Sequence, residues 1–115
     1  MAISEFEIKR CEKLVSAYVE KHRPPAHIRS QVDLGFRIKD QSIEIFEIRP
    51  LWNNPDKIIE EMQAKTTYVK KTKTWKVYWQ RADLKWHSYQ PTPEVETLEE
   101  FLALVDKDDH CCFKG

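Results

Sequence analysis

Lysine and aromatic side chains alternate along residues 65–90, which carry 7 basic side chains and 1 acidic side chain. Aromatic rings on an open sheet can stack on nucleobases, while neighbouring cations neutralise phosphates. The segment therefore predicts a binding surface for an anionic partner such as nucleic acid. Its expected members are Lys70, Lys71, Lys73, Lys76, Tyr78, Lys85, His87 and Tyr89.

Two simpler interpretations compete with this binding surface. Antiparallel sheets commonly leave one face wet, and tyrosine rings there pack on lysine stems. Alternatively, residues 91–115, with 2 basic and 7 acidic side chains, fold back and neutralise the basic segment. The whole chain has 19 basic and 19 acidic side chains, and this balance argues against a dedicated, high-affinity nucleic-acid binder.

An acidic pair gives a third candidate, a metal-dependent nuclease of the restriction-enzyme type. Asp33 precedes Glu47-Ile48-Arg49, and two strand carboxylates beside a cation can hold Mg²⁺ and orient water. Arg49 stands where a lysine is usual, and arginine handles protons poorly. A β-bulge near Phe46 is needed to bring the two carboxylates to one face of the sheet.

Other chemistry finds little support. His110-Cys111-Cys112 lacks the spacing of a zinc site, so we expect no metal and no cofactor. The chain has two glycines, too few for a phosphate-binding loop or a dinucleotide fingerprint. Neither G-x-S-x-G nor H-E-x-x-H occurs. We therefore expect a binding module rather than an enzyme.

Charge asymmetry also favours a homodimeric protein-interaction domain, in which basic residues 65–90 of one chain meet acidic residues 91–115 of another. Nothing in the sequence is apolar enough to span a membrane, and the first residues do not resemble a secretory signal. Three cysteines, two of them adjacent, argue against a disulfide framework, so a cytoplasmic location is expected.

Apolar spacing predicts the elements of the first half. Residues 8–19 repeat apolar side chains every three or four positions, which predicts a helix that ends before Pro24. Strict alternation around Asp40-Gln41 predicts a hairpin with Gly35 opposite Phe46 and Arg37 opposite Glu44. Asn54-Pro55 is typical of a helix start, so a short helix with Ile58, Ile59 and Met62 on its buried face is expected.

Two further hairpins and a helix are predicted in the second half. Residues 64–69 and 75–80 form one hairpin, and tight closure of the next pairs Trp79 with Trp86. The core face then holds Trp75, Val77, Trp79, Leu84 and Trp86, and Pro91 and Pro93 end the sheet. A capping box, Thr97 with Glu100, begins the last helix.

The order of these elements predicts an α+β fold. An antiparallel meander of about four to five strands is flanked by an N-terminal and a C-terminal helix, and residues 1–115 form a single domain.

Several blocks of the sequence resemble a bacterial family called domain of unknown function 3024. They are Arg49-Pro50-Leu51-Trp52, Ala64-Lys65 with Tyr68-Val69, Trp75-Lys76-Val77-Tyr78-Trp79, Arg81 to His87, and Cys112-Phe113-Lys114-Gly115. The resemblance covers nearly the whole chain. It implies a small stand-alone protein and carries over no catalytic residues, because the family has no assigned activity.

Overall fold

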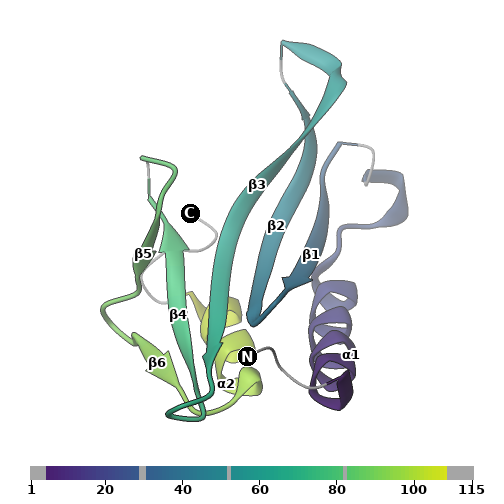
Figure 1. Ribbon diagram of the computed structural model, residues 1–115. Helices are drawn as coiled ribbons and strands as arrows, with labels where there is room; N and C mark the ends of the chain where they lie inside the picture. Colours follow the sequence, from purple (N-terminus) through teal and green to yellow (C-terminus); the bar gives the residue numbers. More distant parts are fainter. Residues whose placement is uncertain (1–4, 29–30, 52, 82, 109–115) are drawn as a thin grey trace.

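The computed structural model describes residues 5–28, 31–51, 53–81 and 83–108, and it confirms the predicted α+β fold. Two helices flank an antiparallel sheet (Figure 1). In chain order the elements are α1 (Glu5–His22), the 3-10 turn η1 (Ala26–Ile28), β1 (Asp33–Lys39), β2 (Ser42–Leu51), β3 (Asn54–Val69), β4 (Thr74–Gln80), β5 (Trp86–Ser88), β6 (Glu94–Val95) and α2 (Leu98–Lys107).

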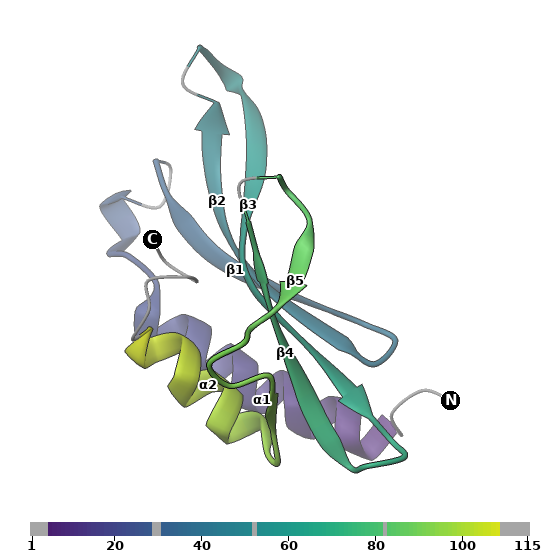
Figure 2. The ribbon, with the colours of Figure 1, turned by 90° about the vertical axis from the view of Figure 1, so that its left-hand side faces the viewer.

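The strands follow one another across the sheet in the order β1-β2-β3-β4-β5, and β6 pairs with β4 beyond Pro93. The sheet thus continues past the prolines that were expected to end it. Both helices lie on the same side of the sheet (Figures 1 and 2). We call that side the helix-covered face and the other the open face. The core between the helices and the sheet includes Val15, Ile43, Ile45, Val77 and Phe101.

The first hairpin has the predicted register. Gly35 lies opposite Phe46, Arg37 opposite Glu44, and Ile38 opposite Ile43. The Phe46 ring covers Gly35 on the open face, where an added Cβ would lie 3.0 Å from Phe46 Cε1. Alternation of apolar and polar residues therefore determined both the pairing and the face of each side chain.

The helix expected after Asn54 does not form, and that prediction is wrong. Residues 54–63 instead extend β3, which pairs with β2 as far as Leu51 opposite Asn54. A helix here would have three apolar side chains to bury and would leave the backbone of β2 unpaired. Pairing satisfies that backbone, and the β-branched Ile58 and Ile59 suit a strand. Ile58 remains 59% exposed, so it is not the buried residue that was predicted.

A β-bulge interrupts β3 at Gln63. Ile45 pairs with Ala64 but Phe46 pairs with Met62, so Gln63 is an extra residue in the β3 strand. The β1–β2 ladder stays continuous through the same region. The bulge therefore changes the facing of β3 side chains and leaves those of β1 and β2 as they were.

The β4–β5 hairpin closes one residue away from its predicted register. Trp79 lies opposite His87 and Gln80 opposite Trp86. Leu84, with a φ of 63°, adopts the left-handed conformation and is 77% exposed. A shift of one residue turns every β5 side chain to the other face of the sheet. Trp86 and Leu84 are therefore not core residues, whereas Trp75 and Val77 are buried as predicted.

The last helix begins at Thr97, as predicted. The Glu100 N–H donates to Thr97 Oγ1 over 3.1 Å. Acidic residues of α2 contact α1: Glu99 pairs with Arg10 at 2.9 Å, and Asp106 lies 3.3 Å from His22. These acidic residues of α2 therefore lie against α1, whereas Glu94 of β6, in the same acidic segment, lies opposite Lys76 of β4.

Candidate functional site

Four side chains come together on the open face of β3, β4 and β5. Lys65 lies opposite Tyr78, Lys76 precedes Tyr78 by two residues, and Trp86 is the diagonal neighbour of Tyr78 across the β4–β5 pair. Lys65 Nζ lies 5.7 Å from the centroid of the Trp86 ring, a cation–π contact. We call Lys65, Lys76, Tyr78 and Trp86 the basic-aromatic platform.

Local sequence explains why the platform faces away from the core. Val77 is fully buried against the helices, so its neighbours Lys76 and Tyr78 point to the open face. Their partners across the sheet must share that face, which places Lys65 beside them. Trp86 joins them because the β4–β5 turn shifts β5 by one residue.

A shallow depression of about 560 Å³ adjoins the platform and shares Lys65 with it. Its other lining residues are Arg37, Lys39, Asp40, Ser42 and Glu44. Arg37 is held by Glu60 at 2.7 Å, and this contact raises the pKa of the Arg37 guanidinium. Glu44 lies 3.4 Å from Arg37, so part of the positive charge is neutralised within the protein. Lys39 and Lys65 are the other cations of the depression.

The predicted lysines do not form one patch. Lys76 lies on the open face, but Lys70, Lys71 and Lys73 lie at the β3–β4 turn and Lys85 at the β4–β5 turn. These turns are at opposite ends of β4, whose seven residues span about 20 Å at about 3.3 Å per residue. All four turn lysines are exposed.

His87 and Tyr89 are not on the open face, which corrects two of the predicted site residues. The shifted register places His87 opposite Trp79, whose side chain faces the helices, so His87 faces the helix-covered side. Tyr89 lies two residues further along and therefore faces the same side. His87 Nε2 lies 2.9 Å from Asp83 Oδ2. The Lys85 N–H, and secondly His87, hold the pKa of Asp83 below its usual value. Tyr89 is 1% exposed, and its N–H donates to the Val77 carbonyl.

Sequence reasoning missed two members of the platform, Lys65 and Trp86. The register of the β3–β4 hairpin could have revealed Lys65, since Ala64 and Thr66 alternate with it and are buried. Trp86 had no such signal, because its facing depends on the conformation of the preceding turn.

The strand register argues against the nuclease candidate. Asp33 lies opposite Ile48 and Glu47 opposite Leu34, so the two residues occupy alternate positions of the ladder, although both border a cavity of about 290 Å³ beside Tyr18 of α1. Arg23 donates two hydrogen bonds to the Asp33 carboxylate, from Nε to Oδ1 at 2.9 Å and from Nη2 to Oδ2 at 2.8 Å. The bulge that could have joined the carboxylates lies in β3 instead, where it does not alter their facing.

Metal-binding clusters were also sought elsewhere. Among residues 5–28, 31–51, 53–81 and 83–108, no three His, Cys, Asp or Glu side chains are placed to hold an ion. His110, Cys111 and Cys112 lie outside the described residues. Cys11 is buried in the core, and burial raises the pKa of its thiol. That thiol is therefore a packing group.

The fold and the platform together define a small α+β domain with an open antiparallel sheet, and no described helix is long and apolar enough to cross a membrane. The chain belongs to the family described as "Domain of unknown function (DUF3024)", which it matches over residues 3–115. Comparison with curated proteins and with solved structures gave no match.

Proposed function

We propose that this protein is a binding module that takes single-stranded nucleic acid on the open face of its sheet. The observation that carries the proposal is the placement of Tyr78 and Trp86 as diagonal neighbours, flanked by Lys65 and Lys76, on a face that neither described helix covers. Aromatic rings on a sheet stack on unpaired bases, and lysines beside them contact the phosphates.

The expected affinity is moderate because few cations are available. Lys39, Lys65 and Lys76 share the open face, while Arg37 is already held by Glu60. Three phosphate contacts to a single strand predict that the logarithm of the binding constant falls with the logarithm of salt concentration with a slope of about −2. Lys76 also has Glu94 as its cross-strand neighbour, which reduces its contribution.

Fluorescence anisotropy with labelled single-stranded and duplex oligonucleotides, measured across a salt series, tests the proposal. We expect single strands to bind more tightly than duplexes. Replacing Trp86 with alanine should weaken single-strand binding about tenfold or more, since a base stacked on an aromatic ring is worth about 1–3 kcal/mol. Phe6→Ala is the matched control, because Phe6 is 78% exposed and lies on α1, away from the platform.

The lysines are tested separately. Lys76→Ala should reduce the magnitude of the salt slope, whereas Lys107→Ala on α2 should leave it unchanged. The proposal is refuted if no oligonucleotide binds at low salt. It is equally refuted if W86A and F6A bind single strands as the unaltered protein does.

A further inference from the structure

A cavity of about 290 Å³ lies between the end of α1 and the first three strands. Tyr18 and His22 of α1 border it, as do Leu34 of β1, Glu47 of β2 and Gln63 of β3. Glu47 lies opposite Leu34, which packs against the core, so both side chains face the helix-covered side. The cavity is therefore separate from the basic-aromatic platform, which lies on the open face.

The β-bulge gives this cavity a polar side chain. Ala64 is buried opposite Ile45, and Met62 lies opposite Phe46, so Gln63 is the extra residue between two regular pairs. Bulges redirect a side chain and are frequent beside functional sites. Gln63 is half-buried at the cavity, and its side-chain amide makes no hydrogen bond within the described part of the chain.

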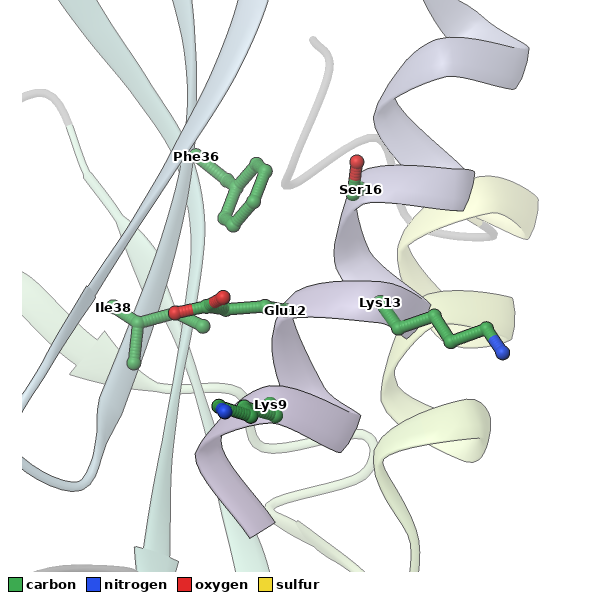
Figure 3. A pocket seen from close by; sticks show the side chains of 6 residues that line it. All are labelled: Lys9, Glu12, Lys13, Ser16, Phe36 and Ile38. Atoms are coloured by element: carbon green, nitrogen blue, oxygen red, sulfur yellow. The ribbon is translucent and has the colours of Figure 1, made fainter. Parts of the chain in front are cut away.

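The cavity is better enclosed than the larger depression of about 510 Å³ between α1 and β1 (Figure 3). In Figure 3 the Lys13 side chain points away from Phe36 and Ile38. All four helix residues that line the larger depression are exposed: Lys9, Glu12, Lys13 and Ser16. The described residues that line the smaller cavity are all buried or half-buried. Ligand sites bury most of their ligand, so the smaller cavity is the better candidate.

The Tyr18 hydroxyl is a polar group without a partner at this cavity. Tyr18 is 9% exposed, and its ring packs on the His22 ring with centroids 4.4 Å apart. Its hydroxyl makes no hydrogen bond to the described residues. Every fully buried polar side-chain atom of those residues has a partner, so the Tyr18 oxygen is one that a small molecule can reach. Burial raises the pKa of Tyr18 to about 12, so the neutral hydroxyl can accept or donate a hydrogen bond.

The charges around the cavity favour a cation. Glu47 lies opposite Glu61 in the β2–β3 ladder, and like charges in that position repel each other. One guanidinium serves both carboxylates, because Arg49 contacts Glu61 and lies 3.9 Å from Glu47. Asp33 also borders the cavity, but Arg23 already neutralises it. Glu47 is therefore the carboxylate at the cavity that lacks a close cation of its own.

The remaining groups indicate that this cation is organic. His22 has Asp106 3.3 Å from its Nε2, so it adds no net positive charge to the cavity. No lysine or arginine is among the described residues that line it. Within the same described ranges, no three His, Cys, Asp or Glu side chains are placed to hold a metal ion.

We propose that the cavity binds the primary ammonium group of a small organic molecule with an apolar stem. A primary ammonium has three N–H donors and no acceptor. The Glu47 carboxylate, the Tyr18 hydroxyl oxygen and the Gln63 amide oxygen are acceptors for them from three elements of the fold. Val32 and Leu34 provide an apolar wall for the stem. The proposal does not rest on nucleic-acid binding, because it uses no residue of the platform.

Titration of the full chain with n-butylamine, followed by amide NMR spectra at pH 7 and constant ionic strength, tests the proposal. This amine is protonated at pH 7, as lysine is. We expect the amides of Leu34 and Gln63 to shift with a dissociation constant of about 1 mM, a plausible value for so small a ligand. n-Butanol and butyrate have the same stem without the positive charge, and each should bind at least about tenfold more weakly.

Glu47→Gln tests the recognition of charge without risk to the fold, because it removes the repulsion between Glu47 and Glu61. We expect n-butylamine to bind about tenfold more weakly or worse. Glu44→Gln is the matched control, since it makes the same charge change on the open face of the same strand and should leave the affinity unchanged. Tyr18→Phe keeps the ring and removes the hydroxyl, so it should weaken binding about threefold to tenfold.

The proposal is overturned if n-butylamine shifts no amide at the cavity, or if n-butanol shifts these amides equally well. It is also overturned if E47Q and E44Q lose the same affinity, since that effect would come from net charge alone. Trp86→Ala separates the two proposed sites, because it should abolish stacking on the platform and leave the affinity for n-butylamine unchanged. Failure of oligonucleotide binding with intact amine binding would remove the proposed function and leave this site in place.

Discussion

Replacing Gly35 with alanine tests the packing of the first hairpin. An added Cβ would lie 3.0 Å from Phe46 Cε1 and 3.0 Å from Ile48 Cδ1. The Ile48 methyl is the end of a half-buried side chain and can rotate away. The Phe46 ring is 4% exposed and lies under Arg37, whose guanidinium is 5.0 Å from the ring centroid. We therefore expect the ring, rather than the methyl, to determine the cost.

Two opposing effects decide the sign of the change in stability. Alanine reduces the entropy of the unfolded chain and should stabilise the fold by about 0.5–1 kcal/mol. Forcing a methyl group into a packed site costs about 1–3 kcal/mol. We expect the cost of the added methyl group to exceed the entropic gain, so the free energy of unfolding should fall by about 1 kcal/mol. For a chain of 115 residues this corresponds to a decrease in Tm of about 4 °C.

Urea denaturation of G35A, F46L and the double variant forms a cycle that isolates this contact. Gly35→Ala should be neutral or stabilising in the F46L background, because leucine leaves room for the new methyl group. Ile48→Val, which removes the other close atom, should relieve G35A much less. If G35A stabilises the natural protein, or if the G35A and F46L effects simply add, the ring does not constrain this position and the reasoning fails.

Two other predictions concern the helices. Thr97→Ala should lower the free energy of unfolding by about 1 kcal/mol, because the Glu100 N–H loses its acceptor, whereas Thr97→Ser should nearly restore it; equal losses in urea denaturation would contradict this role for the hydroxyl. Burial, aided by Asp106 and Asp108, raises the pKa of Tyr18 from 10.0 to about 12. The neutral phenol is favoured in the folded state, so its contribution is complete below pH 10 and is lost as the pH rises from 10 to 12. Unfolding measured across this range should show a steeper loss of stability for the natural protein than for Y18F, and identical pH dependence would contradict burial of the phenol.

The first hairpin shows how much of this fold can be predicted from sequence. Residues 34–45 alternate between apolar residues and polar residues or glycine on both sides of a short polar turn. The alternation predicted the partner of Gly35 and the face of Phe46, and the structure confirms both. This prediction succeeded because the turn is short and the core requires one face, so a slip by one residue would expose Ile43 and Ile45.

Residues 54–63 show where local signals mislead. Asn54-Pro55 resembles a helix start, and three apolar residues follow at helical spacing. This segment nevertheless forms a strand, because its backbone pairs with the backbone of β2. The hydrogen bonds that decide the outcome join residues distant in the chain, and local propensity does not register them.

The candidate site depended on a similar tertiary detail. Lys76 and Tyr78 were placed on the open face correctly, because Val77 between them must be buried. Trp86 was assigned to the core and His87 and Tyr89 to the surface, and the turn at Leu84 reversed all three. The sequence indicated the basic-aromatic segment, but the conformation of the β4–β5 turn determined which of its aromatic residues lie on the platform.

By itself, the sequence determined the class of fold, the first and last helices, the first hairpin and the helix-covered face of β4. Each of these depends on apolar periodicity or on a cap, and both are properties of neighbouring residues. Only the tertiary structure decided that β3 continues through residues 54–63, where the bulge falls, and which way Trp86 faces. Those outcomes depend on backbone pairing and on one left-handed residue, whose effect on parity extends along the whole strand that follows.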